Sequence, residues 1–213
     1  MKNKVDLILD YLDEIIKEPK CELYFSKDYQ LVIAVMLSAQ TTDKRVNKVT
    51  EVLFSKYPSL KALKEANVKD LEDVIRELGS FTKKAAAVKE IARILDEKYQ
   101  GIVPASRKSL EAMPMVGRKT TNVILSELYH KPNIAVDTHV ERVSKRLSLV
   151  KDNDSVLNIE NKLKRKIPRK DWSKFHHQMV LFGRYYCLAK KPKCDDCKLQ
   201  EICNYYKLKQ KNI

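Results

Sequence analysis

Residues 113–122 read Met-Pro-Met-Val-Gly-Arg-Lys-Thr-Thr-Asn, which combines a tight turn with the start of a helix. Pro114 and Gly117 mark the turn, and Lys119 lies in the first turn of the helix. The first N–H groups of a helix have no partner within it, and the helix dipole favours an anion at this end. Because a lysine here opposes the dipole, we interpret Lys119 as facing a phosphate, or as a nucleophile with a carboxylate as its helper.

A carboxylate follows eighteen residues after that lysine, within residues 134–139, Ile-Ala-Val-Asp-Thr-His. Asp137, or the threonine after it, is expected to cap the next helix. On that helix His139, Arg142 and Arg146 recur at i, i+3 and i+7. This stripe is either a solvated basic face or a set of contacts with a phosphate backbone.

Composition indicates a mainly helical, basic protein. The 213 residues include 42 Lys and Arg against 28 Asp and Glu, a formal net charge of +14. Such an excess favours a polyanionic partner. Only 4 Gly and 7 Pro are present, and no Asn-Gly or Asp-Gly dipeptide suggests a β-hairpin.

No apolar run approaches the roughly 20 residues needed to span a bilayer, so no membrane partner is expected. The N-terminus reads Met-Lys-Asn-Lys-Val-Asp and lacks the apolar segment of a secretory signal. We therefore expect a cytoplasmic protein, and a nucleic-acid partner would make it nucleoid-associated.

Apolar periodicity and helix-breaking residues predict a series of helices. The apolar run at 31–37 is interpreted as a buried helix, and the Lys-rich tail at 207–213 is expected to be frayed. The other expected helices cover residues 4–17, 43–56, 60–65, 68–77, 83–99, 106–112, 117–130, 154–166 and 172–186, with one more following Asp137.

Four of the five cysteines have the spacing C-x6-C-x2-C-x5-C near the C-terminus: Cys187, Cys194, Cys197 and Cys203. Four thiols so close together in an intracellular chain indicate a metal site, either zinc or an iron–sulfur cluster. A pair of structural disulfides is the alternative. Cys21 stands apart and is expected to be a small buried hydrophobe.

These segments together resemble the endonuclease III family of DNA glycosylases. That family has a helix-hairpin-helix of the pattern L-P-G-V-G-R-K-T-A-N followed by V-D-T-H, and the same cysteine spacing. The resemblance extends from Ser38 to Cys203. It implies an all-α, two-lobed helix-hairpin-helix fold with a C-terminal [4Fe–4S] loop. One lobe would be a helical barrel at 22–132, and residues 1–21 plus 133–213 would form the iron–sulfur cluster domain.

The resemblance also implies an activity. The chain would be a monomeric, bifunctional DNA glycosylase and AP lyase of base excision repair. It would bind double-stranded DNA containing damaged bases or abasic sites, and remove oxidised pyrimidines. Lys119 would form a Schiff base with the sugar, Asp137 would assist, and β-elimination would cut the strand 3′ to the lesion. The four clustered cysteines would ligate the iron.

Other residues are expected to contact DNA. Gln40 would fill the gap left by the extruded base, although it is equally well an exposed loop glutamine. Phe81 would wedge into the duplex, although an aromatic between helices is more often part of a core. The full set of candidate DNA contacts is Gln40, Phe81, Val116, Gly117, Arg118, His139, Arg142, Lys191 and Lys193.

Three alternatives compete with this interpretation. An adenine-mismatch glycosylase would generally lack a lysine at position 119 and carry an extra C-terminal domain. A non-enzymatic iron–sulfur DNA-binding protein would not need the carboxylate of Asp137. A zinc-binding interaction protein would differ in its metal content.

Met115 stands where the family has the first hairpin glycine. A non-glycine residue with left-handed φ costs about 1–2 kcal/mol. We therefore expect a turn with ordinary φ at Met115 and with the methionine side chain packed on the hairpin.

Overall fold

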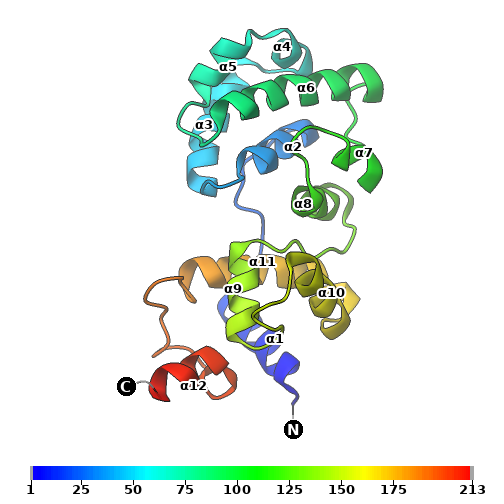
Figure 1. Cartoon of the computed structure of the whole chain (residues 1–213). Helices are drawn as coiled ribbons and strands as arrows, with labels where there is room; N and C mark the ends of the chain where they lie inside the picture. The colour runs from blue at the N-terminus through cyan, green and yellow to red at the C-terminus, as the bar shows by residue number, and fades with distance from the viewer. Residues whose placement is uncertain (1, 212–213) are drawn as a thin grey trace. The chain divides into compact units, whose positions relative to one another are not determined.

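The computed structural model describes residues 2–211, and its regular elements within this range are α-helices and short 3-10 helices without any strand (Figure 1). The all-α prediction is confirmed. Contacts divide the chain into two compact units. The unit Glu22–Lys131 contains the helix-hairpin-helix and is called the hairpin unit below. The second, Met1–Cys21 with Pro132–Ile213, contains the four clustered cysteines and is called the cysteine unit.

Seven helices of the hairpin unit follow one another in the chain, close to the ranges expected from the sequence. They are α2 (Asp28–Leu37), α3 (Asp43–Lys56), α4 (Leu60–Glu65), α5 (Val68–Val74), α6 (Phe81–Tyr99), α7 (Arg107–Glu111) and α8 (Arg118–Tyr129).

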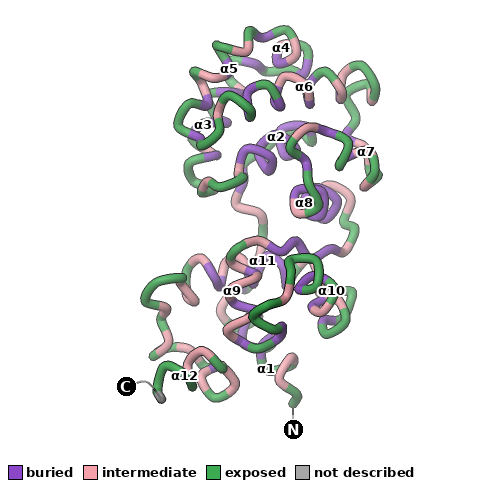
Figure 2. The backbone as a smooth tube through the Cα atoms, in the orientation of Figure 1, coloured by how far each residue is buried: buried purple, intermediate pink, exposed green. Residues whose placement is uncertain are grey.

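Helix α2 is the centre of the hairpin unit. Nine of its ten residues are buried, and it packs on α3, α6 and α8 (Figures 1 and 2). A helix that is apolar on every side needs neighbours on every side. The run at 31–37 is therefore a buried helix, as expected.

The cysteine unit combines the N-terminal helix with the C-terminal third of the chain. Its elements are α1 (Lys4–Ile15), α9 (Thr138–Arg146), α10 (Val156–Lys166), a 3-10 turn at Arg169–Asp171, α11 (Trp172–Tyr185), a 3-10 turn at Gln200–Ile202 and α12 (Asn204–Lys211). Apolar residues of α1, α9, α10 and α11 form one core that includes Leu12, Val143, Leu163 and Phe175.

Helices α9 and α11 pack closely because α11 has a glycine at their contact. A Cβ on Gly183 would lie 2.8 Å from the Cβ of His139 and 3.2 Å from Nη2 of Arg142. The Cβ of His139 is attached directly to the helix backbone and cannot move aside, and Nη2 of Arg142 is held by its hydrogen bond to the Gly183 carbonyl. Gly183 therefore sets the distance between α9, which begins at Thr138, and α11, which leads into the cysteines.

The expectation of a frayed tail is wrong for the described residues, because helix α12 extends to Lys211. Its early residue Tyr205 stacks under the Arg146 guanidinium, 4.2 Å from the ring centroid. This contact ties α12 to α9 in spite of its many lysines. Residues 212 and 213 of the tail lie outside the described range.

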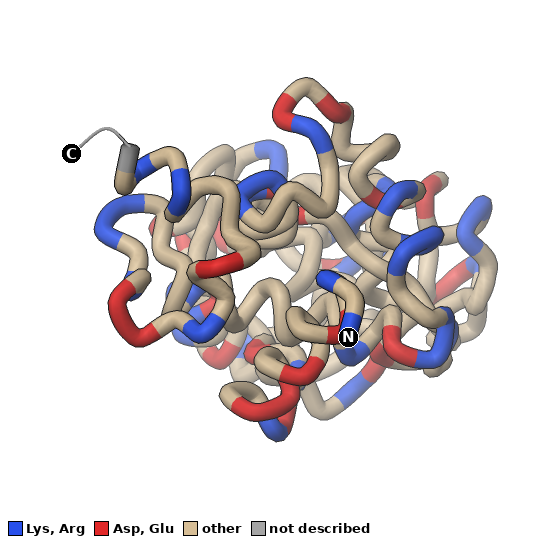
Figure 3. Tube along the Cα trace, turned by 90° about the horizontal axis from the view of Figure 1, so that it is seen from below, with Lys and Arg blue, Asp and Glu red and all other residues tan. Residues whose placement is uncertain are grey.

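Basic and acidic residues are both spread along the chain, and basic residues are more frequent in the sequence (Figure 3). None of the helices that the structure describes has the length and apolar character needed to cross a membrane.

Candidate functional site

The hairpin connects α7 to α8 through a turn that backbone hydrogen bonds define. The N–H of Val116 donates to the carbonyl of Met113 at 3.2 Å, and the N–H of Thr121 donates to that of Gly117 at 2.9 Å. The Val116 side chain is buried in the unit. Its part in any contact with DNA is therefore limited to its backbone.

Met115 has φ +59 and its side chain is 43% exposed, so the expected unstrained turn with a packed methionine is wrong. The reason lies in the turn itself. Pro114 and Met115 are the two central residues of a β-turn closed by the bond from Val116 to Met113. A type II turn has proline at its second position and requires positive φ at its third, where glycine normally stands. Met115 takes this conformation without being a glycine.

Gly117 is the N-cap of α8 and has φ −93, which any residue can adopt. No atom lies within 4 Å of the Cβ that another residue would have here. The turn is thus open on this side, next to the first N–H groups of α8. Arg118 and Lys119 are the first two residues of the helix, with Arg118 exposed and Lys119 half-buried.

Asp137 is the N-cap of α9, as expected. Its Oδ1 accepts hydrogen bonds from the N–H of His139 at 2.9 Å and of Val140 at 2.8 Å. Both bonds use one oxygen, so the carboxylate is fixed in place and Oδ2 can act on another group. Lys119 belongs to the hairpin unit and Asp137 to the cysteine unit.

The stripe of basic residues on α9 is not a solvated face. The Arg142 guanidinium donates to the carbonyl of Gly183 at 2.7 Å and to that of Cys187 at 3.2 Å, at the end of α11. Burial lowers the pKa of Arg142. Burial also lowers the pKa of His139, and Arg142 and Arg184 act in the same direction. DNA contact by His139 and Arg142 stays a prediction, and both residues have a packing role in this unit.

Arg146 holds the start of the cysteine loop, residues 187–203. Its guanidinium donates to the carbonyls of Leu188 at 2.7 Å and Ala189 at 3.0 Å, and lies 3.3 Å from Sγ of Cys187. The sequence showed Arg146 only as a member of the stripe. Its role follows from the position of the loop, which no local pattern encodes.

All four clustered cysteines line one cavity of about 270 Å³. Tyr11, Arg146, Phe182 and Tyr205 also contribute to its wall. Burial is the main cause that raises the pKa of Cys194 and of Cys197, and neighbouring thiols add to it. Such a pocket suits a group that binds thiolates and offsets their charge. Cys21 is half-buried rather than buried, and it is not part of this wall.

The cavity, of about 270 Å³, has room for a group larger than one ion. Among residues 2–211, no three His, Cys, Asp or Glu side chains converge closely enough to hold a single metal ion. A four-iron cluster is larger, and each of its irons takes one cysteine. The four sulfurs around a shared cavity fit such a cluster.

The remaining candidates lie on loops. Gln40 is exposed with φ +58, and Phe81 is the half-buried first residue of α6, 5.8 Å from the Arg76 guanidinium. Lys191 and Lys193 are exposed on the cysteine loop. Lys193 also lies over the ring of Tyr186, at 5.7 Å from its centroid. Lys198, in contrast, forms an ion pair with Glu14.

Comparison with known proteins places the chain in a class. Residues 33–169 match the HhH-GPD superfamily of base excision DNA repair proteins, and the chain belongs to this superfamily. Endonuclease III of Bacillus subtilis is 42% identical over 200 residues, which are 94% of this chain and 91% of that protein. Endonuclease III of Escherichia coli K12 is 40% identical over 93% of each chain. A trapped endonuclease III–DNA covalent intermediate has a TM-score of 0.93 and 42% identity, covering 99% of this chain and 100% of that one.

Proposed function

We propose that the chain is a bifunctional DNA glycosylase and AP lyase of base excision repair, acting on damaged double-stranded DNA. One observation carries this assignment. Lys119 lies in the first turn of the helix after the hairpin, in a chain whose fold matches an endonuclease III trapped covalently on DNA. Phosphate binding alone would not need the half-buried lysine followed by a fixed carboxylate at Asp137.

The proposed reaction begins with extrusion of the damaged base from the duplex. The neutral amine of Lys119 attacks C1′ of the deoxyribose, and the bond from C1′ to the base breaks, with its electron pair leaving on the base. The sugar ring opens and the nitrogen becomes a Schiff base. Loss of a proton from C2′ then expels the 3′ phosphate and cuts the strand. Asp137 takes a proton from the amine or stabilises positive charge at C1′, and Oδ2 is the oxygen left for this task.

Backbone and side chains of both units supply the proposed DNA contacts. The open turn at Gly117, with Arg118 and the backbone of Val116, would bind a phosphate at the start of α8. Gln40 and Phe81 would enter the duplex, and the exposed amines of Lys191 and Lys193 would face phosphates. Binding to chromosomal DNA would place the protein with the nucleoid in the cytoplasm.

We further propose that Cys187, Cys194, Cys197 and Cys203 hold a [4Fe–4S] cluster in their shared cavity. The cluster would supply four iron–thiolate bonds and no open position for substrate. Its role is therefore structural. Arg146 supports the same loop through the carbonyls of Leu188 and Ala189.

The proposed substrates are oxidised pyrimidines, and the test is trapping on matched duplexes. The protein is incubated with borohydride and duplexes that carry an oxidised pyrimidine, an abasic site or no lesion. A Schiff base is reduced to a stable amine, so the first two duplexes should give a covalent complex and the third should not. Trapping on the abasic duplex alone would limit the assignment to the lyase. If no duplex gave a covalent complex, the assignment as a glycosylase and lyase would be wrong.

A further inference from the structure

One cation lies in the core of the hairpin unit. Lys84 is on α6, only 1% exposed, and it is among the largest of the fully buried side chains. Its position in the sequence indicates burial, because it shares a helix face with the apolar residues Val88, Ile91 and Leu95. A lysine on such an apolar stripe is rarely buried without a partner. Among the described residues no carboxylate pairs with it, and burial lowers its pKa.

The partners of Lys84 are carbonyl groups at the end of α2. Its Nζ donates to the carbonyl of Leu37 at 2.9 Å and to that of Ala39 at 2.8 Å. The last carbonyls of a helix have no partner within it, and the dipole favours a cation there. The ammonium thus satisfies carbonyl groups that a C-capping group would usually satisfy. It also fixes the backbone of Ala39, the residue before Gln40.

Gln40 has the left-handed conformation, with φ +58. The bond from Thr41 N–H to the Ser38 carbonyl, at 3.1 Å, holds the other side of this residue. A non-glycine residue pays about 1–2 kcal/mol for such a φ. Strain of this kind persists only where the surroundings fix the backbone. Lys84 supplies one of the fixed points.

The same lysine is bonded to a second strained residue. Its backbone N–H donates to the carbonyl of Ser80 at 3.0 Å, and Ser80 has φ +58 directly before Phe81. This backbone bond is the ordinary first bond of α6 and does not depend on the side chain. Lys84 therefore joins the end of α2, through its ammonium, to the start of α6, through its backbone. One loop presents Gln40 and the other presents Phe81, and both are exposed or partly exposed.

We propose that Lys84 is a positioning residue, which holds the Gln40 loop and the Ser80–Phe81 turn at a fixed separation so that both side chains enter the duplex in one step. This inference rests on the proposed function of the two side chains. Two loops that are already fixed lose less conformational entropy when they bind DNA than two mobile loops would lose. Lys84 would touch neither the DNA nor the reacting atoms.

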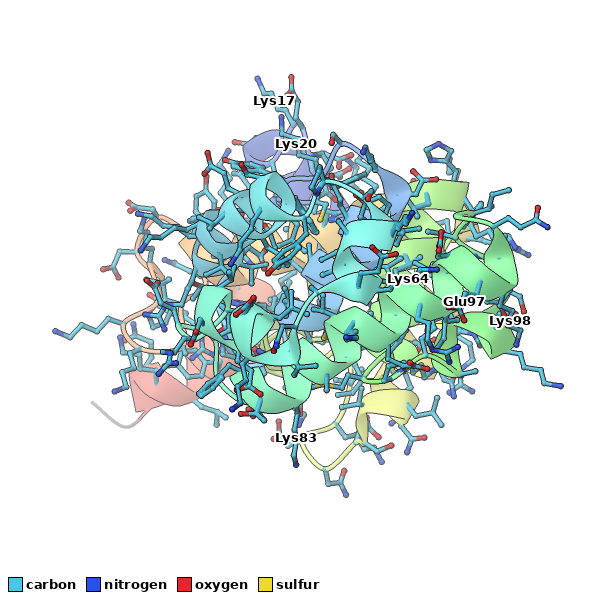
Figure 4. All side chains as sticks on the ribbon, turned by 90° about the horizontal axis from the view of Figure 1, so that it is seen from above. Lys17, Lys20, Lys64, Lys83, Glu97 and Lys98 are labelled. Carbon is cyan, nitrogen blue, oxygen red and sulfur yellow. The ribbon has the colours of Figure 1, made fainter. Side chains whose placement is uncertain are left out.

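The test replaces Lys84 with methionine, which keeps the aliphatic stem and removes the donors. The matched control is Lys83→Met, because Lys83 precedes it on α6, is exposed and points outward (Figure 4). Each protein is titrated into a duplex with an uncleavable abasic-site analogue and into the undamaged duplex. A fluorescent base analogue opposite the lesion reports entry of a side chain into the stack.

For Lys84→Met we expect about tenfold weaker binding to the abasic duplex, the equivalent of one or two buried hydrogen bonds. We expect most of the fluorescence change to be lost, and unchanged binding to undamaged DNA. Lys83→Met should match the wild type on the fluorescence signal. Lys84→Gln keeps two N–H donors and should recover part of the affinity. Equal loss on both duplexes, or an unchanged fluorescence signal in folded Lys84→Met, would overturn the proposal.

A second measurement remains decisive if Lys84→Met does not fold. Gln40→Ala, Phe81→Ala and the double variant change an exposed loop residue and the half-buried first residue of α6, so the fold should stay intact. Because the loops are held by one residue, their effects on abasic-site affinity should be coupled, and strict additivity would contradict the inference. Borohydride trapping by the wild type tests the proposed function separately from the positioning role of Lys84. A protein that is trapped on DNA but shows no coupling between Gln40 and Phe81 has the proposed function without the positioning role.

Discussion

The hairpin turn and the cysteine loop are both irregular segments expected to meet DNA, but the structure holds them in different ways. Residues 112–117 are short, lie between two helix ends and are fixed by backbone hydrogen bonds such as that from Val116 to Met113. The cysteine loop, 187–203, is much longer and buries one apolar side chain fully, that of Leu199. Its other supports are Arg146 and four thiols around a cavity.

Because of this difference, changes in the hairpin turn should affect catalysis, and changes in the cysteine loop should affect stability. A turn that backbone bonds define should survive changes in its functional side chains. A loop whose supports converge on a cavity depends on what fills the cavity, because metal binding and local folding are coupled. The hairpin should therefore yield variants that are folded but inactive. The cysteine loop should yield variants that lose structure and function together.

The largest expected effect on chemistry comes from Lys119→Gln. The amide cannot form a Schiff base, so the borohydride-trapped complex with abasic DNA should fall below detection. Binding of the abasic duplex and the melting temperature should stay near the wild type, since the turn does not depend on this amine. A gel assay measures the covalent complex, and calorimetry measures the melting temperature.

Arg118→Gln is the matched control, one residue earlier on the same helix and exposed. It should weaken binding and still be trapped. Trapping of the Lys119 variant at the wild-type rate would contradict the assignment of the nucleophile. A large fall in its melting temperature would contradict the comparison between the two segments.

The largest expected effect on stability comes from Cys197→Ser. Loss of one of four ligands should release the iron, remove the brown colour and lower the melting temperature strongly. Iron and sulfide analysis should give about four irons per chain in the wild type, as a [4Fe–4S] cluster requires. Cys21→Ser is the control and should keep the full iron content. One zinc per chain in a colourless wild type would refute the cluster.

A smaller effect is expected from the double variant Lys191→Ala, Lys193→Ala. Both amines are exposed on the cysteine loop, so the fold should not change. Each lost phosphate contact lowers the slope of log affinity against log salt by roughly 0.9. The slope should fall by up to about 1.8 for damaged and undamaged duplexes alike. Lys198→Ala is the control, because the Lys198 ammonium is paired with Glu14 and should contribute little. A change confined to lesion-bearing DNA would show that these lysines bind something other than phosphate.

Local patterns predicted most of the fold. The apolar spacing predicted the helices, the apolar run on α2 predicted a buried element, and Asp137 was expected as an N-cap. These features depend on neighbours in the chain, which periodicity and capping rules describe well. Cysteine spacing predicted a metal site, which stays a prediction, and all four of these cysteines line one cavity.

Features that depend on distant partners were not predicted. Lys84 finds its carbonyls on α2, and Arg146 finds its own on the cysteine loop. For Arg146 the sequence allowed a solvated face or a phosphate contact, and neither residue's backbone partners could be identified before the partner segment was placed. Helix α12 was missed for the same reason, because Tyr205 packs on Arg146. The error at Met115 was different, since proline at position 114 already favoured a type II turn.

The smallest expected effect concerns Met115, and it tests whether the hairpin turn is strained. Its φ of +59 costs about 1–2 kcal/mol for a non-glycine residue. Glycine removes this cost but makes the unfolded chain more flexible, at about 0.4–1 kcal/mol. The exposed side chain contributes little packing. Met115→Gly should therefore raise stability by about 0.5 kcal/mol, which corresponds to about 1–2 °C in the melting temperature for a chain of this size.

Ser148→Gly is the matched control in the cysteine unit, because Ser148 is exposed and also has left-handed φ, at +51. It should be stabilised to a similar degree. Both variants should keep their affinity for an abasic duplex within about twofold, well below the tenfold change that 1.4 kcal/mol represents. The reason is that the open side of the turn lies at Gly117, which neither variant alters.

Much tighter binding by Met115→Gly alone would show that the methionine obstructs a phosphate. Lower stability of Met115→Gly with a stabilised Ser148→Gly would show that the hairpin turn gains more from methionine packing than it loses in backbone strain.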